Sequence, residues 1–226
     1  MKRCTIEMLD DHLKSKVEQC RNIFESVYAF IHVDIFEARE NIVYFNREIN
    51  HLHYLIRGKA KTSLVHENGR RSIIQFVEPD EFIGELSLID VEKQPKDVVA
   101  ISECICISIA FADAKAILLK DDKFLLTLSR YIGEKLLKRT WYYTKNQNYE
   151  LKNRLAAHLL MSANKGIYQE KHTETAEFLG VSYRHLLYTF KIFQEEGLIV
   201  KQKKGYRVDE KRLEILASDI EIGQYI

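Results

Sequence analysis

The chain has 226 residues, of which 46% are hydrophobic and 30% are charged, and its formal net charge is +1. This length and composition fit a globular protein with two modest domains. The near balance of charges excludes a generally basic nucleic-acid coat, so any DNA contact must come from a local cluster of cations. No apolar run is long enough to cross a bilayer, and the N-terminus is too charged for a signal peptide. We therefore expect a cytoplasmic protein without a membrane partner.

The first half of the chain changes from a helical to a strand pattern. Apolar side chains recur at steps of three and four residues through the first thirty positions, which predicts helix there. From Phe36 to Ile109 short strands follow one another, at 41–44, 52–58, 60–66 and 73–77, with turns at 67–69, 79–82 and Pro95. This spacing, with no helix between the strands, predicts a small antiparallel β-roll or barrel.

Cysteines and paired histidines are the groups here that could carry metal or redox chemistry. The four cysteines are Cys4, Cys20, Cys104 and Cys106, and they lack the closely spaced pairs of zinc or iron-sulfur sites. We expect them to be reduced and buried, with a redox role as the alternative. His51 and His53 share one strand face but have no third ligand nearby in sequence. We therefore expect no metal site and no cofactor.

Residues 122–149 form an unusually long predicted helix, about 40 Å at ~1.5 Å per residue. Its apolar stripe is formed by Leu125, Leu128, Ile132, Leu136 and Tyr143. Such a stripe is typical of a helix that packs against an identical partner, which predicts a homodimer. The alternative is a core helix that packs on its own β-roll.

The segment from His172 to Val208 has the pattern of a helix, a tight turn, a second helix and a two-stranded wing. Gly180 is suited to end the first helix in the left-handed conformation, and Ser182 is suited to cap the second. The apolar positions of the segment are Ala176, Phe178, Leu179, Leu186, Leu187, Phe190 and Phe193. The outward positions of the second helix carry donors, aromatic rings and cations that suit base edges and phosphates.

The wing distinguishes a DNA-reading module from an ordinary helix hairpin in a core. Two short strand signals, 198–200 and 206–208, enclose the basic turn 201–205. A core hairpin needs no cationic turn, whereas a wing can contact phosphates. We predict DNA contacts from Thr175, Ser182, Tyr183, Arg184, His185, Tyr188, Lys191, Lys203 and Lys204.

The chain from about 36 to 216 resembles the Crp/Fnr family of bacterial transcription regulators. The resemblance rests on the order and spacing of the segments YLIRG at 54–58, DEFIGEL at 80–86, NRLA at 153–156, LGVSYR at 179–184 and EGLI at 196–199. Residues 181–188 and the Lys-Lys-Gly-Tyr wing look most like the YeiL-type regulators. The resemblance implies an α+β chain in three parts: a cyclic-nucleotide-binding-like β-roll (1–121), a dimerisation helix (122–149) and a winged helix-turn-helix domain (150–226). It also implies double-stranded DNA and RNA polymerase as partners.

The resemblance fails at two sites. In cyclic-nucleotide-binding relatives a Gly-Glu pair, matched here by Gly84 and Glu85, is followed about ten residues later by Arg-Ser, which is Gln94 and Pro95 here. A neutral amide lacks the charged fork of a guanidinium, and Lys96 supplies only a point charge, so we expect weak or no cyclic AMP binding.

Arg139 from the long helix could replace the lost cation, and we place it with Gly84, Glu85 and Thr140 in a candidate pocket for an unknown small-molecule effector. In the second helix of the DNA-reading module, Arg184 and Tyr188 stand where many relatives carry Glu and Arg, so the operator of those relatives does not transfer.

A dimeric, sequence-specific DNA-binding transcription regulator is the function that the sequence favours. The alternative is a small-molecule-binding or redox-sensing module of the same fold with weak or no DNA function. An enzyme is the least favoured class, because we find no nucleophile elbow, Walker loop or metal-ligand set, and we assign no catalytic residues.

Overall fold

The computed structural model describes residues 1–67 and 71–217. These residues group by their mutual contacts into two units, 1–67 with 74–133 and 71–73 with 134–217. Two parts of the sequence-based predictions lie outside the described residues: positions 68 and 69 of the predicted turn, and 218–226 of the predicted DNA-binding domain.

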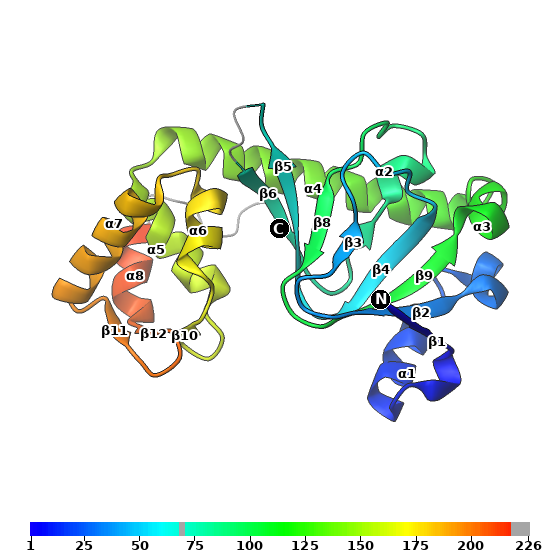
Figure 1. The fold of residues 1–226 in the computed structure, drawn as a ribbon, viewed down its shortest axis with the longest axis horizontal. Helices are drawn as coiled ribbons and strands as arrows, with labels where there is room; N and C mark the ends of the chain where they lie inside the picture. Colours follow the sequence, from blue (N-terminus) through cyan, green and yellow to red (C-terminus); the bar gives the residue numbers. More distant parts are fainter. Residues whose placement is uncertain (68–70, 218–226) are drawn as a thin grey trace. The chain divides into compact units, whose positions relative to one another are not determined.

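Two sheets form a β-roll in the first unit (Figure 1). The five-stranded sheet contains, in spatial order, β1 (Lys2–Cys4), β2 (His32–Phe36), β9 (Cys104–Ala110), β4 (His51–Arg57) and β7 (Phe82–Ile83). The four-stranded sheet contains β3 (Asn41–Val43), β8 (Asp97–Ala100), β5 (Ala60–Val65) and β6 (Arg71–Val77). The printed strand pairs of both sheets are antiparallel. The predicted antiparallel roll is therefore confirmed.

Strand β9 has both of its faces covered. Cys104 and Cys106 pack in one apolar cluster with residues of both sheets, in the interior of the roll. Ile105, Ile107 and Ile109 point to the opposite face and belong to a second cluster with the helices. This explains why β9 reads as a nearly continuous apolar run rather than a strict alternation of apolar and polar residues.

The helices of the first unit cover the outer face of the five-stranded sheet. They are α1 (Asp11–Gln19), α2 (Glu85–Leu88), α3 (Phe111–Leu118) and the first half of α4 (Asp122–Asn148), with two 3₁₀ turns at Ile6–Met8 and Glu25–Phe30. Phe24 lies at the centre of this cluster and makes edge contacts with Tyr54 and Phe82. The predicted N-terminal helix is correct only for 11–19, and the sequence pattern missed β1 and β2. The predicted long helix 122–149 is confirmed.

The second unit has a helical core with a small sheet. It contains α5 (Leu151–Ser162), β10 (Ile167–Tyr168), α6 (His172–Leu179), α7 (Tyr183–Glu195), β11 (Ile199–Lys201), β12 (Tyr206–Val208) and α8 (Glu210–Ala217). The strands pair in the order β10-β12-β11, so the predicted two-stranded wing gains a third strand. Leu155, Phe190 and Leu213 are fully or almost fully buried in the shared core. Across the described ranges, no helix combines the length and hydrophobicity needed to span a membrane.

Candidate DNA-binding surface and effector site

The turn between α6 and α7 is built as the sequence predicts. Gly180 ends α6 with φ +67°, in the left-handed region that favours glycine. Ser182 caps α7, because its Oγ accepts a hydrogen bond from the His185 N–H at 3.2 Å. Arg154 of α5 adds a support that the sequence analysis missed: its guanidinium donates to the Leu179 carbonyl oxygen at 2.7 Å. A carbonyl at the C-terminal end of α6 is thereby satisfied.

One face of α7 is open to solvent. We call the exposed residues Tyr183, Arg184, His185, Tyr188 and Lys191 the reading face. Tyr188 is 64% exposed, whereas Leu186, Phe190 and Phe193 on the other side are buried. Leu187 was predicted to face inward but is 37% exposed, so that prediction is wrong. Thr189 takes the inner position instead, and its hydroxyl donates to the His185 carbonyl oxygen at 3.1 Å.

Thr175 does not belong to the exposed surface. Its side chain is fully buried in α6. Its hydroxyl hydrogen-bonds to the Tyr168 hydroxyl and donates to the Lys171 carbonyl oxygen. Both the burial and the internal bonds keep this side chain from a duplex, so we exclude Thr175 from the proposed DNA contacts. Ser182 is exposed, but its side chain is engaged as the cap of α7.

The wing carries exposed cations on a constrained turn. Lys203 and Lys204 are exposed at the tip, and the Gln202 N–H donates to the Gly205 carbonyl oxygen at 3.0 Å. Gly205 has φ +83°, and a Cβ atom there would lie 1.9 Å from the Tyr168 carbonyl oxygen. A side chain at this position would therefore push the wing away from β10.

Stacked rings connect the wing to α7. The His172 ring at the start of α6 lies 4.3 Å from the Phe190 ring and 5.5 Å from the Tyr206 ring. Burial, and then the nearby charge of Lys201, lower the pKa of His172 below its ordinary value. The imidazole is therefore favoured in its neutral form, as a stacking ring. The wing and the reading face are held in one packed unit.

In the candidate effector site, packing in the first unit explains Gly84. Gly84 has φ +90°, and a Cβ atom there would lie 2.7 Å from the His51 carbonyl oxygen, so the fold itself requires glycine. Glu85 begins α2 and is only 3% exposed. The carboxyl group of Glu85 is therefore held inside the fold and not on the surface.

The residues at the family's Arg-Ser position do not present a cation. Gln94 is exposed and Pro95 is buried. Lys96 is paired with Glu92 at 2.6 Å, which neutralises the nearest ammonium. A cavity of about 720 Å³ lies beside this loop and is lined by residues that include Gln94, Ser87 and Lys115, but not by Gly84 or Glu85.

The two predicted pocket residues of α4 lie in the second unit. Arg139 is partly buried, and the Thr140 hydroxyl donates to the Leu136 carbonyl oxygen at 2.9 Å. The hydroxyl is therefore satisfied within its own helix. Whether Arg139 supplies the missing cation stays a prediction.

The apolar stripe of α4 divides into a core part and an exposed part. Leu128 is 2% exposed, and Leu125 and Ile132 pack against the same core of the first unit, so for these three the alternative of a core helix is correct. Leu136 and Tyr143 are exposed, by 64% and 65%. The exposed positions that recur at steps of three and four are Leu126, Ser129, Gly133, Leu136, Thr140 and Tyr143, which we call the dimer face.

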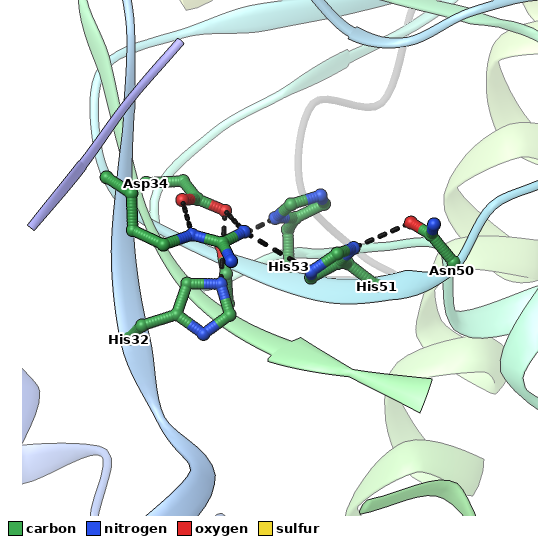
Figure 2. Close-up of polar contacts among 7 residues, drawn as sticks. His32, Asp34, Asn50, His51 and His53 are labelled. Carbon is green, nitrogen blue, oxygen red and sulfur yellow. Dashed lines mark hydrogen bonds and ion pairs between the residues drawn. The ribbon is translucent and has the colours of Figure 1, made fainter. Parts of the chain in front are cut away.

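The cysteines are poorly placed for redox chemistry. All four are free and buried. Burial raises the pKa of Cys20 and of Cys104 to about 11, so neither thiol forms the reactive thiolate near neutral pH. No group of three or more His, Cys, Asp or Glu side chains in 1–67 and 71–217 is arranged to hold a metal ion. His51 and His53 instead join a polar cluster around the buried Asp34, which the sequence did not reveal (Figure 2).

Comparisons with known proteins agree with this architecture. The cyclic nucleotide-binding domain family matches residues 34–121. The chain is 42% identical over 187 residues to regulatory protein YeiL of Escherichia coli O157:H7, across 82% of this chain and 85% of that protein. It is 22% identical over 185 residues to the cyclic AMP receptor protein of Thermus thermophilus, across 80% and 84% of the two chains.

Among solved structures, a CRP-family transcriptional regulator from Thermus thermophilus matches with a TM-score of 0.72 and 19% identity, over 82% of this chain and 96% of that one. None of these three proteins is named as an enzyme. The similarity to YeiL extends over four fifths of both chains. Together with the succession of a roll, a long helix and a winged helix-turn-helix along this chain, it shows that the chain belongs to the Crp/Fnr family of transcription regulators.

Proposed function

We propose that this regulator binds a two-fold symmetric site on double-stranded DNA as a homodimer. Residues 150–226 bind the DNA, 122–149 pair the protomers and 1–121 carry the input. The observation that carries the proposal is the reading face of α7. Its donors and aromatic rings are exposed on a helix whose N-terminus is capped by Ser182 and whose opposite side is buried. The protein acts in the cytoplasm, where it meets RNA polymerase on the chromosome.

The reading face and the wing have different tasks in this proposal. Arg184 has the guanidinium fork that pairs with O6 and N7 of guanine in the major groove. Tyr183, His185 and Tyr188 contact phosphates or a thymine methyl group. Lys191 is paired with Glu195 at 3.5 Å on the surface, a weak interaction that a phosphate can replace. Lys203 and Lys204 contact the phosphate backbone without reading bases.

The dimer face supports pairing through α4. Its members follow one another at steps of three, four, three, four and three residues, the spacing of a coiled-coil seam. The Ser129 and Thr140 hydroxyls donate to the carbonyl oxygens of Leu125 and Leu136, so both side chains could be buried between helices without losing a hydrogen bond. Gly133 would allow a close approach of two helices. Such a dimer places its half-sites about 34 Å apart, one turn of DNA.

We also propose that the regulator has lost the response to cyclic AMP that its relatives' names describe. Gln94 carries no charge, and Lys96 is engaged by Glu92. A buried cyclic phosphate would therefore lack its strongest charge-assisted partner. Gly84 and Glu85 are retained in the fold, and the input is a different small molecule or signal. No observation favours the redox-sensing alternative, because the thiols are buried.

Genome-wide DNA selection with the purified protein tests DNA binding, symmetry and half-site together. We then compare Arg184→Ala, Lys204→Ala and the matched control Lys211→Ala, which removes an exposed lysine from α8. Arg184 makes no hydrogen bond or ion pair with a described residue, so its loss should not weaken the fold. Arg184→Ala should cost roughly 1–3 kcal/mol of specific affinity and relax one base position.

Lys204→Ala should weaken binding equally on specific and random DNA and reduce the salt dependence by about one ion. The control should leave both affinities unchanged. Equal losses on specific and random DNA for Arg184→Ala would contradict its assignment as a base reader. Retention of full affinity by both Arg184→Ala and Lys204→Ala would move the DNA surface away from α7 and the wing.

A further inference from the structure

A polar cluster lies on the inner face of the five-stranded sheet, beside the apolar interior of the roll (Figure 2). At its centre is Asp34 of β2, whose side chain is 1% exposed. Arg3 of β1 donates to both carboxylate oxygens, from Nε at 2.9 Å and from Nη2 at 3.3 Å. The Arg3 side chain is 47% exposed and comes from a three-residue edge strand. The cluster therefore pairs the buried carboxylate of Asp34 with the half-exposed guanidinium of Arg3.

His51 of β4 extends this pair with a defined protonation state. Its Nε2 lies 3.3 Å from Arg3 Nη2, and its Nδ1 lies 2.7 Å from Asn50 Oδ1. A guanidinium N–H can only donate, so Nε2 of His51 must be an unprotonated acceptor and Nδ1 carries the hydrogen. A proton added at Nε2 would convert this acceptor into a donor that faces a second cation. The Arg3–His51 contact therefore exists only while His51 is neutral.

His32 of β2 offers Asp34 a second cation. Its Nε2 lies 3.4 Å from Asp34 Oδ2, the same oxygen that Arg3 Nη2 contacts. This nitrogen is buried, and it has no hydrogen-bond partner among the described residues. The two atoms are within ion-pair distance but are not arranged as a hydrogen bond. A positive charge on this ring would form an ion pair with Asp34 and would compete directly with Arg3.

We propose that Arg3, Asp34, His32 and His51 form a proton-operated clasp, which holds strand β1 on β2 at neutral pH and releases it on mild acidification. On protonation His32 takes over the carboxylate of Asp34 while His51 repels the guanidinium of Arg3. Strand β1 is also held by three paired residues, by Cys4 at the edge of the apolar core and by an exposed contact of the N-terminal amine with Glu40. An exposed ion pair of this kind contributes little. The clasp would make the first unit sensitive to pH, a signal that the proposed DNA binding does not involve.

The surroundings of the clasp set the direction of the pH response. Burial is the main cause that lowers the pKa of both His32 and His51 below the ordinary value of 6.5. The charge of Arg3 adds to this effect, and the charge of Asp34 opposes it without cancelling it. The other titratable groups that face these histidines are Asp34, His53 and, from α3, Asp113. Cys4 of β1 and Cys106 of β9 face Asp34. Burial lowers the pKa of His53 and raises that of Cys106, so both stay neutral.

Asp34 stays ionised in the closed clasp. Burial is the largest single influence and would raise the pKa of its carboxyl. The hydrogen bonds and charge of Arg3, together with His32 and a hydrogen bond from Ser108, outweigh burial and leave that pKa below its ordinary value. The closed clasp therefore binds fewer protons than the open one. Its stability is complete above about pH 6.5 and is lost as the pH falls through the lowered pKa values of His32 and His51.

Cys4 is a built-in reporter, because it lies in β1 and is only 9% exposed. The full-length protein is labelled with 4,4′-dithiodipyridine at pH 7.5 and pH 5.5, and each rate is divided by that of glutathione at the same pH. The site of labelling is identified by peptide mass. We expect the normalised rate of Cys4 to rise more than tenfold at pH 5.5, while Cys104 and Cys106 in the interior stay protected and report that the roll is intact.

Two variants separate the clasp from general acid sensitivity. The double variant His32→Gln/His51→Gln keeps polar side chains that cannot be protonated, so Cys4 should remain protected at both pH values. Arg3→Ala should leave Cys4 reactive at both. A normalised rate in the wild type that does not change with pH, or a double variant that opens like the wild type, would overturn the clasp.

A second measurement uses the wild type alone and needs no folded variant. The imidazole signals of His32 and His51 in NMR spectra should titrate with midpoints below 6.5, in step with the loss of amide protection in β1. Midpoints at or above 6.5, or protection of β1 that persists through the titration, would refute the proposal. None of these readouts involves DNA, so their failure is distinct from failure of the proposed function.

Discussion

The two parts of the α4 stripe can be separated by replacing one leucine from each with alanine. Leu136 is 64% exposed on the dimer face. Full burial of a leucine side chain contributes ~2–3 kcal/mol, so covering this exposed part contributes about 1–2 kcal/mol per protomer. In a two-fold dimer both protomers carry the substitution, so the loss of dimerisation free energy is roughly 2–4 kcal/mol per dimer. Since 1.4 kcal/mol is a factor of ten, Leu136→Ala should raise the dimer Kd roughly 30- to 1000-fold.

Leu128→Ala is the matched control, with the same atoms removed eight residues earlier in the same helix. Leu128 is 2% exposed in the core of its own unit, so its truncation should lower the free energy of unfolding by ~2–5 kcal/mol. It should leave the dimer Kd unchanged while the protein is folded. Sedimentation equilibrium measures the dimer Kd, and urea unfolding measures the free energy of unfolding. If Leu136→Ala retained the wild-type Kd, or if Leu128→Ala weakened the dimer as strongly, the assignment of the dimer face would be wrong.

Two further substitutions and one ligand measurement follow from the structure. Gly205→Ala should destabilise the second unit by about 2–4 kcal/mol, because left-handed strain adds to a collision with the Tyr168 carbonyl oxygen. Gly180→Ala has the strain without a neighbour within 4 Å and should cost only about 1–2 kcal/mol in the same urea titration; equal costs would show that the collision relaxes freely. Calorimetry with millimolar cyclic AMP should show no saturable heat, because Gln94 is neutral, and a micromolar Kd would contradict the proposed loss of binding.

Elements with strong local signals could be predicted from the sequence. Strand β9 is marked by a nearly continuous apolar run, helix α7 by a helical period, and the wing by a basic turn between two short strand signals. The turn between α6 and α7 follows from a glycine and a capping serine alone. Strands β1 and β10 have three and two residues, too few to show a period, and both exist because a neighbouring strand offers an edge. Such strands depend on contacts that are distant in the sequence.

The α4 stripe shows a different limit of sequence reasoning. Helix α4 carries apolar side chains at adjacent positions, such as Leu125 with Leu126 and Leu136 with Leu137, so two overlapping stripes fit the same periodicity. The helix faces its own roll where Phe82 contacts Tyr131. Because this contact joins segments about fifty residues apart, only the folded structure separates the core stripe from the dimer face.

The candidate sites differ in the same physical way. The reading face is a local property of one amphipathic helix, so five of its residues could be assigned from the sequence, and only buried Thr175 was assigned to the surface in error. The clasp joins four side chains from three strands that are separated by up to 48 residues. Motif Gly84-Glu85 shows the converse error. Its glycine is present because a Cβ atom at position 84 would collide with the backbone of β4, so Gly84 can persist without any nucleotide. A glycine that the fold requires is evidence for the fold and not for a ligand. Evidence for the ligand has to come from residues whose identity the fold does not fix, which here are Gln94 and its neighbours.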